Sequence, residues 1–184
     1  MGWSASQKQQ SRERILQSAA ELFTREGFEN VGINDVMQHA GMTRGAFYNH
    51  FSSKSELYAE AILAAANTAK NLARANASDR KHLIEGYLSL QHREGDTLRC
   101  PLAFLTTDIT QRDQQVRQTY TRVLKGFIHN IQQLDNRETT DEQEAIRQAV
   151  LMIGAVAISR AVDDDSYAEK LLNSCRDGLV SERR

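Results

Sequence analysis

One segment near the start of the chain, Ile33–Phe51, limits the possible folds more than any other. Its first part, Ile33–Ala40, repeats apolar residues at the spacing of one helix face. Gly41 then permits the positive φ that ends a helix sharply, and the hydroxyl of Thr43 can accept a hydrogen bond from the first turn of a second helix. Two short helices joined by a glycine turn predict a helix-turn-helix, whose second helix can enter the major groove of DNA.

The second helix of this segment divides into an inward and an outward face. Phe47 and Phe51 are predicted to pack into the core. Arg44 could donate two hydrogen bonds to guanine O6 and N7, although an ordinary solvated arginine is the plain alternative. Gly45 lacks a side chain and would let the helix approach the groove closely. The residues expected to face outward are Thr43, Arg44, Gly45, Tyr48, Asn49 and His50.

These residues also carry a resemblance to a known family. The pattern AGMTRGAFYNHFSSKSEL resembles the signature of TetR-type transcriptional regulators, and the resemblance extends upstream to cover about residues 8–60. It implies that Tyr48 and His50 bond DNA phosphates. Lys54 opens the next helix, where its ammonium and the free amides of the helix both favour a phosphate. The family commonly has Ser or Thr where this chain has Gly32, so one hydroxyl that could reach a phosphate is missing.

The composition favours an all-α fold, because Pro101 is the only proline and no alternating strand pattern is evident. We expect a three-helix DNA-binding domain at residues 1–53, followed by a helical effector-binding and dimerisation domain at residues 54–184. The net charge is −1, and the first 55 residues hold six basic and five acidic side chains. Non-specific affinity for DNA is therefore predicted to be modest and salt-sensitive. Helices are expected at about residues 6–26, 54–77, 78–93, 100–110, 113–134 and 140–162, with a last one after Asp163–Asp165.

The second part of the chain is expected to hold a small-molecule pocket, by analogy with the family's ligand-binding domain. Aromatic residues and Met at helical spacing are, however, more often plain core. The residues proposed to line the pocket are Tyr87, Phe104, Thr107, Tyr120, Phe127 and Met152. Cys100 precedes a proline at a predicted helix start, where the helix dipole could lower the pKa of its thiol. A small buried side chain is the alternative reading for Cys100.

The longest apolar run, Ala149–Ile158, spans ten residues, too few to cross a bilayer core that needs about 20. We expect it to dimerise the chain through the last two helices, together with Leu171, Leu172 and Leu179. No signal peptide is visible, so cytoplasmic residence is expected. No enzyme motif, cofactor motif or metal-ligand spacing is found.

These features predict a regulator, most simply a repressor, that binds a palindromic operator as a homodimer and is released by a small molecule. One alternative is a redox- or electrophile-responsive regulator that senses through Cys100. A helical enzyme or scaffold that contains the motif by chance is the alternative from another class, and binding to duplex DNA would separate it from the others.

Overall fold

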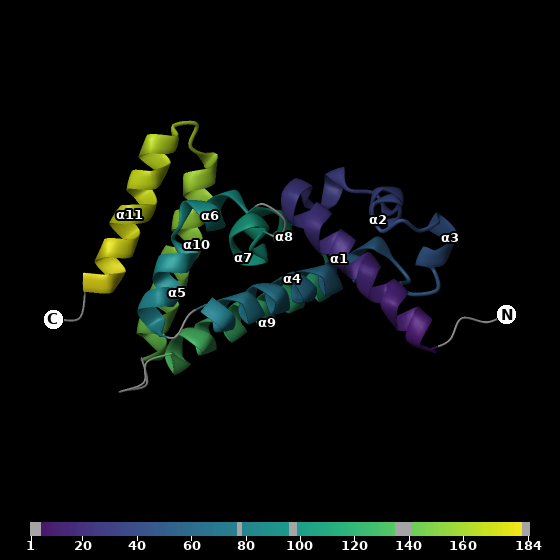
Figure 1. Ribbon diagram of the computed structural model, residues 1–184, viewed down its shortest axis with the longest axis horizontal. Coiled ribbons are helices and arrows are strands. Elements are labelled where there is room, and N and C mark those ends of the chain that lie inside the picture. Colours follow the sequence, from purple (N-terminus) through teal and green to yellow (C-terminus); the bar gives the residue numbers. More distant parts are fainter. Residues whose placement is uncertain (1–4, 77–78, 96–98, 135–140, 182–184) are drawn as a thin grey trace.

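The computed structural model describes residues 5–76, 79–95, 99–134 and 141–181, with side chains omitted at 73–76, and every regular element in these ranges is helical (Figure 1). The prediction of an all-α fold is confirmed. The helices are α1 (Ala5–Asn30), α2 (Ile33–His39), α3 (Arg44–Phe47), α4 (Lys54–Asn76), α5 (Arg80–Tyr87), α6 (Leu90–Glu94), α7 (Pro101–Phe104), α8 (Thr106–Ile109), α9 (Gln114–Gln133), α10 (Glu142–Ala161) and α11 (Asp165–Ser181).

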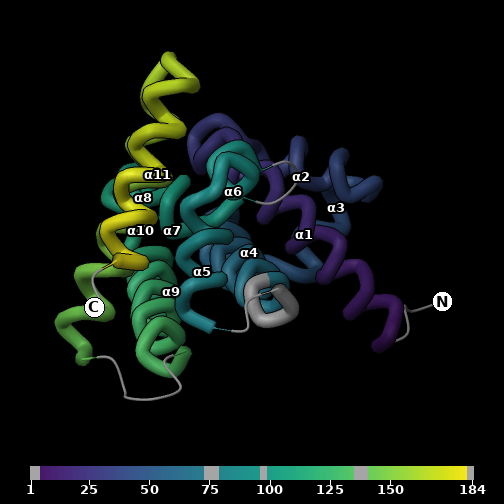
Figure 2. Tube along the Cα trace, turned by 60° about the vertical axis from the view of Figure 1, so that its left-hand side comes forward, coloured from purple at the N-terminus to yellow at the C-terminus, as the bar shows by residue number. Residues whose placement is uncertain are grey.

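The helices form an elongated molecule (Figure 1). α1, α2 and α3 make one end, α4 and α9 lie side by side through the middle, and α10 pairs with α11 at the other end. The short α7 lies between α10 and α1 and contacts both, as the turned view in Figure 2 also shows. None of the described helices is both long enough and apolar enough to span a membrane.

α1 is interrupted near its end, as its sequence predicts. Gly27 has a φ of 78°, a conformation that residues with a Cβ rarely adopt. The helix does not stop there, because the chain resumes helical geometry as far as Asn30. The kink places the Phe28 ring 5.1 Å from that of Tyr58 in α4.

The start of α4 is capped by side chains on both sides. Ser53 Oγ accepts a hydrogen bond from Glu56 N at 3.0 Å, which is one half of a capping box. The Glu56 carboxylate accepts its return bond from Ser52 N at 2.7 Å, one residue earlier than in a standard box. This capping fixes the position of Lys54, the first residue of the helix.

Two of the predicted helices are each broken in the structure. The helix expected at 78–93 ends at Tyr87, because Leu88 leaves helical geometry with a ψ of 42° and Ser89 caps a new helix, α6. The helix expected at 100–110 divides at Leu105, whose φ and ψ are −110° and 2°. The expected starts at Ser78 and Thr140 lie outside the described residues.

Two hydrophobic clusters, named here the first core and the second core, hold the helices together. The first core joins α1–α4 and also takes in Leu105, Ile109 and Val116 from the following helices. The second core joins α5, α7, α9, α10 and α11. The first core therefore crosses the domain boundary expected after residue 53, and that boundary stays a prediction. The largest fully buried residues of the first core are Ile15, Phe23, Met37, Phe47, Leu57, Tyr58, Ile62 and Leu105.

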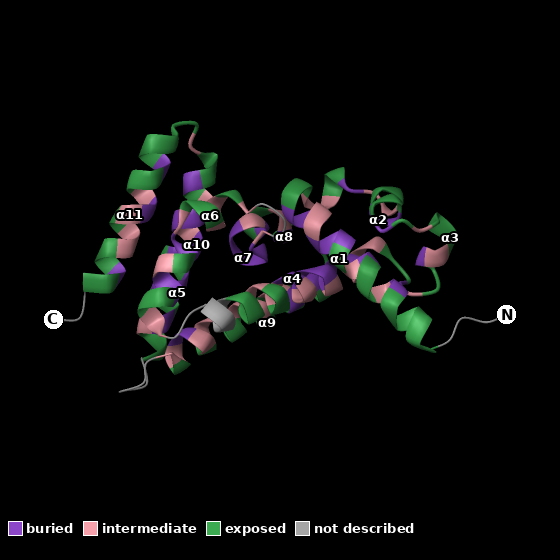
Figure 3. Cartoon of the chain, in the orientation of Figure 1, coloured by how far each residue is buried: buried purple, intermediate pink, exposed green. Residues whose placement is uncertain are grey.

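Some apolar residues expected to face a second copy of the chain are buried inside the subunit instead. Ile153, Leu172 and Leu179 belong to the second core, since α10 and α11 pack against each other. Figure 3 shows buried and exposed positions alternating along both helices. The apolar side chains of these helices that remain exposed are Ile146, Val150, Leu151, Ile158, Tyr167 and Val180.

Candidate nucleic-acid interface and effector cavity

The turn between α2 and α3 has the geometry that its glycine predicts. Gly41 has a φ of 65°, and Met42 N donates to Met37 O at 2.8 Å to close the end of α2. Arg14 of α1 donates to Ala40 O at 2.5 Å. A Cβ on Gly41 would lie 3.1 Å from the Arg14 guanidinium, so both conformation and space favour glycine there.

α3 is shorter than the sequence predicts. It spans four residues and continues as turns through His50. Thr43 occupies its N-cap position with an extended backbone, but the Thr43 hydroxyl makes no capping hydrogen bond, contrary to our expectation. That hydroxyl is free of the predicted capping role.

The outward face of α3 and its following turn is exposed, while the inward face is anchored. Phe47 and Phe51 are buried in the first core, with their ring centroids 5.7 Å apart. Around a Cβ at Gly45 there is open space to 4 Å. Tyr48 is 60 % exposed and packs only edge-on against Phe47. The residues of this face with exposed side chains or backbone are Thr43, Arg44, Gly45, Tyr48 and Asn49.

His50 differs from these residues because it is half-buried. Its Nδ1 has no hydrogen-bond partner within the described part of the chain. Burial lowers the pKa of His50, and the nearby charges of Lys8 and Arg12 lower it further. A neutral imidazole with an unused nitrogen can still bond a phosphate oxygen through an N–H.

Lys54 lies at the start of α4 as predicted, but its ammonium is engaged within the chain. Lys54 Nζ lies 4.1 Å from the centroid of the Phe28 ring. Burial lowers its pKa, while the Glu29 carboxylate opposes that shift. The phosphate contact of Lys54 stays a prediction, and it requires the side chain to leave Phe28.

A large cavity of about 980 Å³ opens among α4, α5, α6, α7 and α9. Tyr87 and Phe127 form part of its wall, with their rings 5.2 Å apart. The Tyr87 ring also lies 4.4 Å from the His92 imidazole. Apolar lining from several helices includes Leu63, Ala66, Leu83, Leu102 and Val123, and polar lining includes Asn67, Lys70, Arg122 and Asn130.

Only part of the pocket predicted from sequence lies at this cavity. Tyr87 and Phe127 line it, but Phe104, Thr107, Tyr120 and Met152 do not. Met152 is fully buried in the second core. The Tyr120 hydroxyl donates to Leu102 O at 2.8 Å. Thr107 is exposed on α8, and its carbonyl accepts a bond from Thr110 at 2.7 Å.

His92 also lines the cavity, and no pattern in the sequence indicates it. Its Nε2 is buried and has no partner among the described residues. Burial lowers the pKa of His92 to about 4, so the imidazole is neutral at pH 7. The helix break at Leu88 turns it toward Tyr87, and that break was not predicted.

Cys100 is part of the cavity wall and is buried. Its Sγ lies 3.3 Å from the Tyr87 hydroxyl. Burial raises the pKa of the thiol, and this outweighs the opposing hydrogen bonds from Tyr87 and from the amides of Ala103 and Leu102. The expectation that the start of α7 lowers this pKa is therefore wrong, because loss of water dominates.

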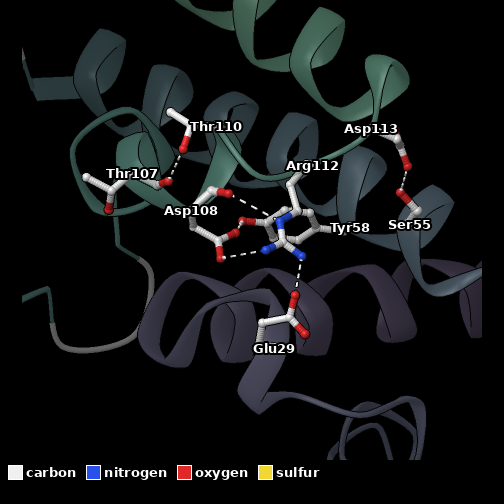
Figure 4. A network of polar contacts seen from close by, with 8 residues as sticks. All are labelled: Glu29, Ser55, Tyr58, Thr107, Asp108, Thr110, Arg112 and Asp113. Carbon is white, nitrogen blue, oxygen red and sulfur yellow. Dashed lines mark hydrogen bonds and ion pairs between the residues drawn. The ribbon is translucent and has the colours of Figure 1, made fainter.

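A network of polar contacts joins the cavity side of the molecule to α1 and α4 (Figure 4). Tyr58 of α4 donates to Asp108 of α8 at 2.5 Å. Arg112 donates to Glu29 near the end of α1 at 2.6 Å and to the Asp108 carbonyl at 3.2 Å. Ser55 and Asp113 form a further contact beside it. The segment after α7 is thus bonded directly to α1 and α4, and α1 packs against α2 of the helix-turn-helix. We call α3 and the turns that follow it through His50 the reading turn.

The comparisons with known proteins agree with the helix-turn-helix geometry. Residues 15–61 match the family model for bacterial regulatory proteins, tetR family. The chain is 40 % identical over 52 residues to the HTH-type transcriptional regulator AcrR of Shigella flexneri, which is 28 % of this chain and 24 % of that protein. It is 35 % identical over 71 residues to TtgR of Pseudomonas putida, which is 39 % of this chain and 34 % of that protein.

These sequence matches span only about a quarter to a third of the relatives' own lengths. The fold matches over nearly the whole chain. A TetR-family transcriptional regulator from Cytophaga hutchinsonii superposes with a TM-score of 0.78 at 19 % identity, over 98 % of this chain and 97 % of that one. Residues 15–61 therefore match the DNA-binding part of the tetR family, and the whole chain has the fold of a solved TetR-family regulator.

Proposed function

We propose that this protein is a cytoplasmic transcriptional regulator, acting as a repressor, that binds a palindromic operator as a homodimer. The observation that carries the proposal is the outward face of α3, where Arg44, Tyr48 and Asn49 are exposed above buried Phe47 and Phe51. A face held rigidly from behind and free in front suits contact with bases and phosphates.

The apolar stripe on α10 supports the dimer. Ile146, Val150 and Ile158 follow one another at steps of four or eight residues and are all exposed, so they share one side of the helix. A second copy related by two-fold symmetry would cover this stripe. That arrangement would present two reading turns to successive major grooves, about 34–36 Å apart.

The cavity supports control by a small molecule. Its lining is mostly apolar, with a few polar groups at different sides, which is the usual composition of a ligand pocket. An effector that prefers the released state would shift the dimer away from the operator spacing. The polar network of Tyr58, Asp108 and Arg112 and the shared helix α4 would carry that shift to the reading turn.

Control through Cys100 is the second candidate, because this thiol lines the same cavity. Its burial and raised pKa disfavour attack on an oxidant or electrophile. We therefore assign Cys100 to the wall of the pocket. A Cys100→Ser protein that keeps its response to every inducer would support this assignment, whereas selective loss of the response to peroxide would support the thiol sensor.

Selection of DNA fragments by the purified protein, followed by sequencing, tests the proposal directly. We expect a palindrome, and we expect Arg44→Ala to cost about 1–3 kcal/mol of operator affinity and to relax preference at one base pair per half-site. Arg117→Ala is the matched control, since Arg117 is also exposed but lies on α9. Equal loss on every operator variant would remove Arg44 from base reading, and failure to enrich any sequence would reject the proposed function.

The dimer has its own test. Val150 is 62 % exposed, so Val150→Glu leaves both cores intact and should yield folded monomers in sedimentation. Ile153→Glu places a charge in the second core and should unfold the subunit. A wild-type chain that sediments as a monomer at micromolar concentration would contradict the dimer.

A further inference from the structure

Arginine side chains gather where the segment before α7 meets the end of α10. Arg99 precedes α7, Arg160 lies in the last turn of α10, and both lie over the ring of Phe104. Arg160 Cζ is 3.6 Å and Arg99 Cζ is 5.3 Å from the centroid of that ring. None of these three residues lines the effector cavity, so they form a separate location.

A third arginine nearby, Arg93, has hydrogen-bond acceptors within the chain. Arg93 of α6 donates to Ser159 O at 3.1 Å and to Asp165 at 2.9 Å. The end of α10 and the start of α11 therefore hold the Arg93 side chain in place. Arg93 adds positive charge to the same location. Of its two acceptors, Asp165 is the acidic one.

Among the described residues, no such counter-charge pairs with Arg99 or Arg160. Neither forms an ion pair within the part of the chain that the structure describes. Arg99 Nε is buried and has no acceptor among the described residues. Burial, together with repulsion from Arg99 and Arg93, lowers the pKa of Arg160 to about 10. Burial and the charge of Arg25 on α1 lower the pKa of Arg99.

We propose that Arg99 and Arg160, stacked on Phe104, bind a small oxyanion: the carboxylate or phosphate group of a metabolite. A guanidinium that lies over a ring keeps its N–H groups along its edge, and this fork matches a carboxylate or phosphate. An oxyanion would supply the missing acceptor and counter-charge together. The aromatic ring beside the arginines leaves an apolar surface for the rest of the ligand.

Occupation of this site would have a structural consequence. The oxyanion would connect the end of α10 to the segment before α7, close to Arg25 of α1. A ligand that binds only the folded state stabilises it by mass action. We therefore expect binding to raise the thermal midpoint without any need for operator DNA.

The test uses the full chain with inorganic phosphate and, separately, succinate as probes, against sodium chloride at the same ionic strength. We expect at least one probe to raise the thermal midpoint in a saturable way, by roughly 3–6 °C at tenfold excess over its dissociation constant. The more effective probe identifies the phosphate or the carboxylate as the recognised group.

Arg99→Gln and Arg160→Gln should each weaken that response at least tenfold, while Arg117→Gln on the exposed face of α9 should leave it unchanged. If either glutamine variant does not fold, Arg160→Lys keeps the charge, loses the planar fork and should still bind several-fold more weakly in calorimetry. A shift equal to that of chloride, an unchanged response in the arginine variants, or no response because a carboxylate of a second copy fills the site would each overturn the proposal. Operator binding is measured without added oxyanion in every variant, so failure here is distinct from failure of the regulatory function.

Discussion

The first core closes on fully buried aromatic rings, whereas the second core leaves a cavity of about 980 Å³ beside its own aromatic residues. In the first core Phe23 and Tyr58 meet edge-on at 4.8 Å. In the second, Tyr87 lies against Phe127 on one side of an open space. The difference suits the two tasks that we propose for the chain, since a face that reads DNA needs one fixed shape and a sensor needs room for a ligand.

The two cores meet rather than lie apart. Tyr120 and Val123 of α9 pack against both clusters. The bonds from Tyr58 to Asp108 and from Arg112 to Glu29 cross the same region. A rearrangement at the cavity can therefore reach α1 and α4 through a few defined contacts, which is the physical requirement for coupling between two sites.

The largest expected effect is on the filled core. Phe47→Ala should cost about 3–5 kcal/mol, because Phe47 is fully buried and a cavity would remain. Phe127→Ala should cost roughly 1–2 kcal/mol, since Phe127 is half-buried beside space that already exists. Urea unfolding measures both losses.

The Phe47→Ala and Phe127→Ala variants also separate operator binding from effector sensing. Phe127→Ala should lower sensitivity to effector while leaving operator affinity of the free protein nearly intact. Equal losses of stability in the two variants would show that the cores are packed alike and would end the comparison.

The connection between the cores gives the next largest effect. Tyr58→Phe removes a bond to the Asp108 carboxylate and should cost about 1.5–3 kcal/mol. It should also reduce the change in operator affinity that an effector causes. Tyr167→Phe is the matched control, because Tyr167 is 52 % exposed and lies on α11, away from this network. Equal coupling in the two phenylalanine variants would exclude the network as the route.

The cavity side should also respond to acid. The pKa of His92 is lowered from 6.5 to about 4, so on acidification the unfolded chain takes up this proton before the folded one does. The contribution of neutral His92 to the free energy of unfolding is present above about pH 6.5 and is lost as the pH falls toward 4. The loss between pH 7 and pH 5 is about 2 kcal/mol. We expect His92→Gln to show a smaller loss of urea midpoint over that interval. A pH dependence identical to that of the wild type would show that a group other than His92 takes up the proton.

The sequence predicts the first core better than the second for a physical reason. The turn at Gly41 and the capping of α4 rest on local rules for backbone conformation and hydrogen bonding, and these are readable from a few neighbouring residues. The break at Leu88 comes two residues after Gly86, but that glycine lies inside an apolar helical pattern, and no glycine or proline stands next to Leu105.

The site divides in the same way. The outward face of α3 follows from helical spacing beside two buried phenylalanines. The cavity wall depends on which faces of five helices meet. Tyr87 and Phe127 lie at that wall, whereas Met152 belongs to the core, and effector binding by the two aromatic residues stays a prediction. His92 could not be found from spacing, since only the break before α6 brings it to Tyr87.

The smallest effect concerns Lys54, which lies between the two regions. Its ammonium rests over Phe28 in the free protein, an interaction of about 0.5–1 kcal/mol at a partly exposed site. Release of a counterion from DNA can offset that loss, so we expect the side chain to move to a phosphate on binding. Lys54→Ala should then weaken binding to all sequences alike and reduce the slope of log affinity against log salt by about one. The loss of stability in urea should be small and equal to the lost ring contact. An unchanged salt slope with the same small loss would show that Lys54 stays on Phe28 and serves the fold alone.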